Sequence, residues 1–275
     1  MNATTISIAA ILLYTLSWVL ISLRVRSTIQ NAQQNSSHST SNYAKFYFSS
    51  WLIALLLHIL ALHFPLILGK AMALNFFTLA SYVMWFISLI LFITTFKRRI
   101  ESLAIFILPY TILSIILSIL LSTNAGNFIQ MKSGLGLHVL LSLLAYSLLL
   151  LASFQALLLS YQDMRLHAHQ ISGLMRALPS LEDMEHLLFR FITIGVVLLT
   201  FSLISGFIYL DDLFAQRVAH KTILSLVAWV VFTILLFGRW KYGWRGRKAV
   251  HWTLAGFIIL MLAFFGSKFI QEFIL

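Results

Sequence analysis

The stretch LGLHVLLSLLAYSLLLLASFQALLLSY, residues 135–161, contains no Asp, Glu, Lys or Arg. A helix needs about 20 apolar residues to cross the roughly 30 Å hydrocarbon core of a membrane, so this stretch can span it. Similar stretches occur at 4–23, 47–68, 76–96, 102–122, 190–210, 220–238 and 249–271. All are continuous and rich in Leu, Ile and Phe, without the alternation of barrel strands. The sequence therefore predicts an all-α integral membrane protein with about eight transmembrane helices.

The composition indicates the same class. Of the 275 residues, 60% are hydrophobic and 10% are charged, whereas a soluble domain carries about 25% charged residues. Eight spans leave no room for a sizeable soluble domain, so we expect 1–275 to form a single polytopic membrane domain in contact with the lipid bilayer. The net charge of +11 is explained by loop charges that set orientation, and no nucleic-acid partner is expected. The absence of cysteine excludes disulfides and thiolate ligands.

Basic residues are distributed unevenly between the two sets of connecting segments. Most of the 19 Lys and Arg residues fall on one side of the predicted spans. The other side carries Lys70, Lys132, Arg217, Lys221 and Lys268. Because cytoplasmic loops are enriched in Lys and Arg, the richer side is expected to be cytoplasmic. Both termini would then lie on the periplasmic side of a bacterial inner membrane.

Two connecting segments carry local signals. The segment 24–46 is polar and is expected to be a loop. Ser180 followed by Asp183 matches a capping box, in which a hydroxyl and a carboxylate satisfy the first amides of a helix. We therefore expect a helix to begin near Leu181 and to lead into the sixth span.

Acidic residues in the middle of a membrane usually mark ion or proton pathways. All eight Asp and Glu residues fall in loops or at span ends in this assignment, which argues against a proton- or cation-coupled pump. A small-molecule permease would need a polar path through the midplane. Beyond His58 and scattered Ser and Thr, the chain offers little from which to build one.

Histidines are the remaining candidates for chemistry. His58 lies in the middle of the second span, and His63 lies about 1.4 turns further out on the same helix. His138 falls in the outer turn of the fifth span and His220 opens the seventh. The predicted topology therefore places His63, His138 and His220 in one outer layer. Imidazole is a good axial ligand for haem iron, which makes haem binding one interpretation. The alternative is that each histidine forms a hydrogen bond with a neighbouring helix.

Cations at the level of this outer layer would suit the propionates of a haem. The candidates are Lys70, Lys132, Arg217 and Lys221.

Several segments resemble one family of membrane proteins. The segment GLHVLLSLLAY at 136–146 resembles the histidine-bearing helix of the cytochrome c assembly family, the haem-handling integral membrane proteins of the CcsA type. The segment HFPL at 63–66 resembles an earlier family segment. Residues 220–229, the basic turn after them and AFFG at 263–266 resemble its last two spans. The likeness extends over 63–272.

Two further segments are closest to a short bacterial branch of this family, the YpjD-like inner-membrane proteins. They are LPSLEDMEHLLFR at 178–190 and GWRGR at 243–247.

The resemblance implies haem as a cofactor, with His138 as an axial ligand of the haem iron. His63 or His220 would be the second ligand, and His58 would serve if the pocket lies deeper.

The chain departs from the pattern of the family members that deliver haem. They carry a tryptophan-rich outer loop before the penultimate span, and the corresponding segment here, 209–219, has no Trp. No histidine follows Gly266, and Gly238 or a neighbour replaces a family histidine.

The chain is therefore expected to bind haem in an accessory role in haem handling or c-type cytochrome assembly, and not to be an enzyme. The alternative is a non-catalytic partner or regulator of another membrane protein, such as a metal-ion transporter. Faces of small residues, including Gly195, Ser202, Ser205 and Gly256, suit helix packing in either case.

Overall fold

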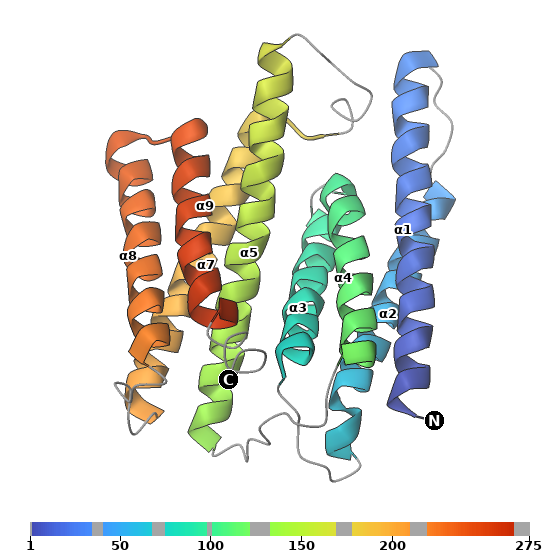
Figure 1. Ribbon diagram of the computed structural model, residues 1–275. Coiled ribbons are helices and arrows are strands. Elements are labelled where there is room, and N and C mark those ends of the chain that lie inside the picture. Colours follow the sequence, from blue (N-terminus) through green and yellow to red (C-terminus); the bar gives the residue numbers. More distant parts are fainter. Residues whose placement is uncertain are drawn as a thin grey trace. The chain divides into compact units, whose positions relative to one another are not determined.

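The computed structural model of the protein (Figure 1) describes residues 2–34, 41–67, 75–97, 101–121, 133–168, 178–209 and 219–266. The helices are α1 (Ala3–Gln34), α2 (Ser41–Ile67), α3 (Phe76–Lys97), α4 (Glu101–Leu121), α5 (Ser133–His167), α7 (Leu181–Tyr209), α8 (Ala219–Tyr242) and α9 (Arg247–Met261), and α9 continues into the π-helical turn η1 (Leu262–Gly266). Eight helices in these residues are long and apolar enough to cross a membrane. The predicted all-α fold with eight spans is confirmed.

Residue contacts divide the chain into two compact units. The first comprises Met1–Ile129 and Ile171–Pro179, and it contains α1 to α4. The second comprises Gln130–Gln170 and Ser180–Leu275, and it contains α5 and α7 to η1. The expected single domain over 1–275 stays a prediction.

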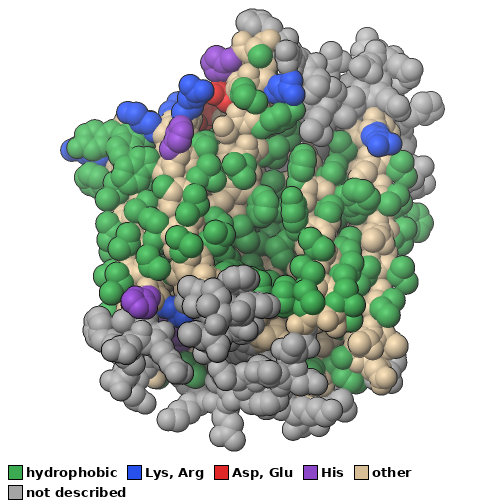
Figure 2. Space-filling model, viewed as in Figure 1, with side chains coloured by type: hydrophobic (Ala, Val, Ile, Leu, Met, Phe, Trp, Pro, Cys, Tyr) green, Lys and Arg blue, Asp and Glu red, His purple; other side chains and the backbone are tan. Residues whose placement is uncertain are grey.

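Side chains along the helices are mainly apolar, whereas Lys and Arg lie near helix ends (Figure 2). The expectation of a loop over 24–46 is wrong for 24–34 and 41–46, because α1 continues to Gln34 and α2 begins at Ser41, and residues 35–40 lie outside the described residues. Arg, Gln and Ala in this segment have good helix propensity. An α-helix also satisfies its own backbone hydrogen bonds, so it need not stop where the apolar stretch stops.

Several polar side chains inside the first unit are paired with partners from neighbouring helices. The indole Nε1 of fully buried Trp51 donates to Ser88 Oγ at 2.8 Å, and Trp85 Nε1 donates to the Leu55 carbonyl at 2.9 Å. The hydroxyl oxygens of Ser17 and Ser50 lie 2.7 Å apart. Hydrocarbon offers no partners to polar groups, so these internal pairs join α1, α2 and α3 into one bundle.

An ion pair closes one end of the first unit. Arg24 Nη1 lies 3.2 Å from Glu101 Oε1, and buried Tyr47 lies between them. The Tyr47 hydroxyl accepts a hydrogen bond from Arg24 Nη1 at 3.0 Å and donates one to Glu101 Oε1 at 2.9 Å. The three residues tie the C-terminal part of α1 to the starts of α2 and α4.

Close helix contacts in the second unit depend on glycine. A Cβ atom at Gly195 would lie 2.8 Å from Leu149 Cδ2, and one at Gly256 would lie 2.9 Å from Phe232 Cε2. Both distances are shorter than packed carbon atoms tolerate, so glycine permits α5 to approach α7 and α8 to approach α9. The predicted packing role of Gly195 and Gly256 is confirmed.

The start of α7 agrees with the capping prediction. The backbone amide of Asp183 donates to Ser180 Oγ at 3.1 Å, and the Ser180 hydroxyl donates to Asp183 Oδ2 at 2.7 Å. The helix begins at Leu181, as expected.

Candidate functional site

The candidate histidines are divided between the two units. His58 and His63 lie on α2 of the first unit, and His138 and His220 lie on α5 and α8 of the second. His138 falls in the second turn of α5 and His220 in the first turn of α8, and the His220 side chain is exposed.

The proposed propionate contacts are only partly described. Lys70, Lys132 and Arg217 lie outside the described residues. Lys221 lies in the first turn of α8 and is half-buried.

His138 is held against α7 by one of its two ring nitrogens. Its Nδ1 lies 2.9 Å from the backbone carbonyl oxygen of Ser202 and 3.1 Å from Ser205 Oγ. The Ser205 hydroxyl donates to the same carbonyl at 2.8 Å. Ser142, one turn further along α5, donates to the His138 carbonyl, and its Oγ lies 3.0 Å from Ser202 Oγ. Four polar side chains thus join α5 and α7 at this level.

This arrangement assigns the proton on the imidazole. A carbonyl oxygen only accepts hydrogen bonds, so Nδ1 of His138 carries the hydrogen and the lone pair of a neutral ring lies on Nε2. Nε2 has no hydrogen-bond partner among the residues that the structure describes. Metal-binding histidines commonly donate one ring N–H to a carbonyl while the other nitrogen binds the metal. His138 shows this hydrogen-bonding arrangement on Nδ1.

His63 has a related geometry within its own helix. Its Nδ1 lies 3.1 Å from the carbonyl oxygen of Ile59, one turn earlier on α2. The imidazole meets the Tyr82 ring edge-on, with centroids 5.6 Å apart. Nε2 of His63 forms no hydrogen bond with the described part of the chain. This side chain is half-buried, and the lone pair of a neutral His63 ring also lies on Nε2.

His58 differs, because both of its ring nitrogens have partners. Nε2 lies 2.9 Å from Ser81 Oγ on α3, and Nδ1 lies 3.4 Å from the Tyr14 hydroxyl oxygen on α1. The side chain is 1% exposed. This geometry matches the alternative reading of an intramembrane histidine, a hydrogen-bonding group that connects three helices.

The described residues contain no group of three or more His, Cys, Asp or Glu side chains that could hold a metal ion. Haem does not require such a group, because the porphyrin supplies four of the iron ligands and the protein supplies one or two. The donor chemistry of His138 fits haem better than a bare metal ion.

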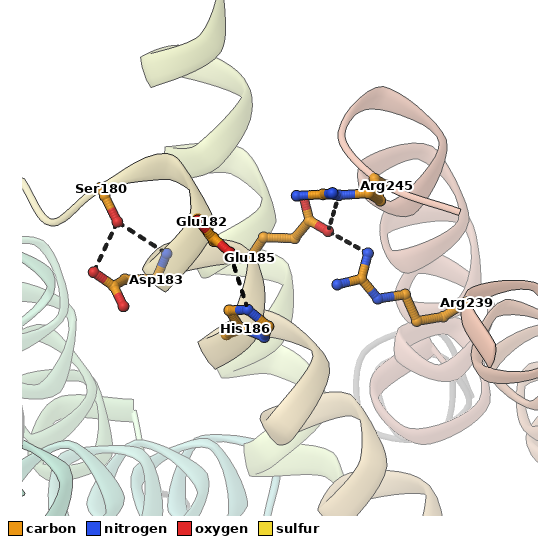
Figure 3. A network of polar contacts seen from close by, with 7 residues as sticks. All are labelled: Ser180, Glu182, Asp183, Glu185, His186, Arg239 and Arg245. Atoms are coloured by element: carbon orange, nitrogen blue, oxygen red, sulfur yellow. Dashed lines mark hydrogen bonds and ion pairs between the residues drawn. The ribbon is translucent and has the colours of Figure 1, made fainter. Parts of the chain in front are cut away.

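The opposite end of the second unit holds a network that the sequence analysis did not find (Figure 3). Glu185 on α7 is 7% exposed. Its Oε1 lies 2.5 Å from Arg239 Nη1 and 3.3 Å from Arg245 Nε. The Arg239 guanidinium carbon also lies 4.6 Å from the centroid of the Phe189 ring. The sequence places Glu185 only near the start of the sixth span, and its burial follows from the packing of α7 against α8.

A tight turn follows α8 and completes this network. Trp244 folds back onto the helix, where its amide donates to the Gly238 carbonyl at 3.1 Å. A Cβ atom at Gly238 would lie 2.4 Å from the Trp244 ring. Gly243 and Gly246 adopt positive φ angles of 64° and 53°, which favour glycine. The turn therefore requires glycine at position 238.

The fold and the histidine-bearing α5 define a multi-pass helical membrane protein with a ligand-competent imidazole at the end of a span. The family described as "Cytochrome C assembly protein" matches residues 43–275, and the chain belongs to this family. Membership links it to haem or cytochrome biogenesis in membranes, in a family that is not a known catalytic one.

Three relatives extend this assignment. The inner membrane protein YpjD of Escherichia coli strain K12 is 31% identical over 227 residues, which cover 82% of this chain and 86% of the relative. The protein HemX of Brevibacillus brevis is 25% identical and covers 47% of this chain and 48% of its own length. The cytochrome c biogenesis protein CcsA of Prochlorococcus marinus is 28% identical, over 32% of this chain and 29% of its own. No solved structure matches the chain.

The eight spans and these relationships make the chain a multi-pass protein of the bacterial inner membrane.

Proposed function

We propose that this protein binds haem and has an accessory role in haem handling or in c-type cytochrome assembly, with His138 as an axial ligand. One observation carries the proposal. Nδ1 of His138 is bonded to the Ser202 carbonyl, which leaves the lone pair on Nε2 without a partner in the described chain. The family to which the chain belongs handles haem, which supports the choice of ligand.

The second axial ligand is proposed from the histidines with an available ring nitrogen. His220 belongs to the same unit as His138, and His63 presents a free Nε2 in the first unit. His58 is the weakest candidate, because both of its ring nitrogens have partners. Lys221, in the first turn of α8, would hold a propionate, and Lys70, Lys132 and Arg217 would do the same.

We place both termini on the periplasmic side, because the end of α8, the turn after it and the start of α9 belong on the cytoplasmic side. This region carries Arg239, Lys241, Arg245, Arg247 and Lys248. His138 and His220, at the opposite ends of their helices, then face the periplasmic side. No catalytic step is proposed. The residues would bind and orient the haem, and the cofactor would supply an iron atom that imidazole can ligate.

The test is a reduced-minus-oxidised visible spectrum of the full-length protein purified in detergent, before and after addition of hemin. We expect a Soret band and an α-band in the wild type. His138→Ala should lose most of both bands. Of His220→Ala and His63→Ala, the variant that removes the second ligand should shift the bands, and the other should leave them unchanged.

His251 provides the matched control. Its Nδ1 lies 2.7 Å from the carbonyl oxygen of Arg247 one turn earlier, as in His63, but it lies at the end of the second unit opposite His138. His251→Ala should leave the spectrum unchanged. A wild type that shows no bands of bound haem, even after addition of hemin, refutes the proposal. That result favours a role as partner of another membrane protein.

A further inference from the structure

A second candidate site lies at the end of the second unit opposite His138. A cavity of about 280 Å³ opens between α5, α7 and the turn that precedes α9. This volume is near the lower limit of small-molecule sites, which begin at about 300 Å³, so the cavity suits a small group. It is separate from the proposed haem ligand and does not depend on the proposed function.

The charged residues of the cavity have both signs and nearly balance. Asp163 from α5 and Glu182 and Glu185 from α7 line it, together with Arg245 from the turn and Arg247 from the start of α9. Arg239 contacts Glu185 from α8. A simple anion in this cavity would meet three carboxylates, and a simple cation would meet the guanidinium groups. The lining therefore fits a group that carries both charges and has no net charge.

The basic side chains of the cavity are exposed enough to bind a ligand. Arg245 contacts Glu185 through Nε (Figure 3), and its side chain is 62% exposed. The Arg247 side chain is exposed at the first residue of α9. Gly246, which precedes α9, has no side chain to cap the first amides of that helix. A phosphate at this position would meet two guanidinium groups and the uncapped N-terminus of a helix.

The carboxylates of the cavity can also bind a ligand. The Asp163 carboxylate is 3.4 Å from Nδ1 of exposed His167, and the Glu182 carboxylate is 3.7 Å from Nε2 of His186. Both contacts are long for hydrogen bonds, and Glu182 is 72% exposed. A primary ammonium group would form shorter hydrogen bonds with these carboxylates.

The geometry points to a binding site for a phosphate ester that carries a primary ammonium group, the chemistry of a phosphoethanolamine head group. Arg245 and Arg247 bind the phosphate, and Asp163 and Glu182 bind the ammonium.

The neighbouring aromatic residues place this site at the depth of lipid head groups. Trp240 and Tyr242 end α8 next to the turn and are 81% and 67% exposed. Exposed Trp and Tyr at the end of an apolar span mark the boundary between hydrocarbon and water. The same head-group chemistry can come from a membrane lipid or from a soluble phosphate ester, and the test separates these sources.

The test is native mass spectrometry of the full-length protein in detergent, titrated with phosphatidylethanolamine, phosphatidylglycerol or phosphatidylcholine. Phosphatidylglycerol lacks the ammonium group, and phosphatidylcholine lacks its N–H donors. We expect phosphatidylethanolamine to bind about tenfold more tightly than either, the effect of one charge-assisted hydrogen bond. Equal retention of the three lipids, or a preference for phosphatidylglycerol, overturns the proposal.

Variants assign the two halves of the head group. Asp163→Asn should weaken binding of phosphatidylethanolamine about tenfold and should strengthen that of phosphatidylglycerol, because a repulsive carboxylate is removed. Arg245→Gln should weaken both. Lys241→Gln removes an exposed cation that does not line the cavity and should change neither. If the variants behave like Lys241→Gln, the site does not exist.

Two additions keep the result interpretable. Arg247→Gln changes an exposed side chain and replaces Arg245→Gln if the latter does not fold. Soluble phosphoethanolamine, added as a competitor, distinguishes the sources. If phosphoethanolamine displaces the lipid with an affinity equal to that of the lipid, the ligand is a soluble phosphate ester. If it does not displace the lipid, the ligand is the lipid. Both results support the head-group chemistry.

Discussion

The two units of this protein contain similar polar contacts, but their histidines are bonded differently. Each unit closes one end with an ion pair, Arg24 with Glu101 in the first and Arg239 with Glu185 in the second. Each also holds a histidine against a neighbouring helix. His58 has partners on both ring nitrogens, whereas within the described residues His138 has them on Nδ1 alone.

This difference separates a structural histidine from a candidate ligand. Both residues lie within apolar spans, and both are candidate ligands on the sequence. What distinguishes them is the number of polar groups that the adjacent helices offer. Serine and tyrosine on two helices saturate His58, and a single face of α7 serves His138.

The ion pair of the second unit should give the largest effect on stability. Glu185→Ala leaves Arg239, with a side chain that is only 25% exposed, without its carboxylate. Breaking such a pair should lower the free energy of unfolding by about 3 kcal/mol, the low end of the range for buried pairs. Titration with denaturing detergent measures it. Glu182→Ala, at a 72% exposed side chain, is the control and should cost less than about 0.5 kcal/mol. Equal losses of unfolding free energy in the two variants would contradict the assignment of Glu185 to a buried ion pair.

The next effect tests the comparison directly. His58→Ala removes the partner of Tyr14 and Ser81 and leaves a buried cavity, at a cost of about 2 kcal/mol. It should leave any bound haem unchanged. His138→Ala should have the opposite profile, with a smaller loss of stability and a lost Soret band. The comparison fails if both variants lose haem to the same extent.

A smaller effect is expected at a helix contact of the second unit. Gly256→Ala places a Cβ atom 2.9 Å from the ring of fully buried Phe232. This overpacking should cost about 1 kcal/mol, measured by the same detergent titration. Gly266→Ala is the control, because its nearest neighbour would lie at an ordinary 3.7 Å. A stabilising Gly256→Ala would show that α8 and α9 are less tightly packed than described.

The smallest effect concerns how the His138 ring is held. Ser205→Ala removes one of the two groups near Nδ1 but leaves the Ser202 carbonyl in place. Stability should fall by about 0.5 kcal/mol, and the haem bands should remain with at most a small change in reduction potential. Spectra recorded at controlled potentials check this. Complete loss of haem would mean that the serine, and not the carbonyl, holds the ring.

The sequence was sufficient for the features that depend on local patterns. Apolar length predicted the eight spans, and Ser180 with Asp183 predicted the start of α7. Polarity was a poor guide to the end of α1, which continues through Arg24 and Arg26 to Gln34 because a helix that leaves the membrane keeps its hydrogen bonds.

The candidate site was predictable in part. His138 could be selected from sequence, but its partners could not. Ser202 and Ser205 stand three residues apart among small residues and suggested only helix packing, because the sequence does not show which face of α7 meets α5. The burial of Glu185 was missed for the same reason. It depends on a turn in which Trp244 packs onto Gly238, far along the chain from α7.

The use of a main-chain carbonyl to hold His138 has an evolutionary consequence. Every residue type at position 202 except one that breaks the helix supplies the same oxygen, so substitutions there preserve the tautomer of the imidazole. Relatives can therefore diverge widely along α7 and still present the same nitrogen. A search for co-varying partners of this histidine would find none at position 202, although that residue holds it in place.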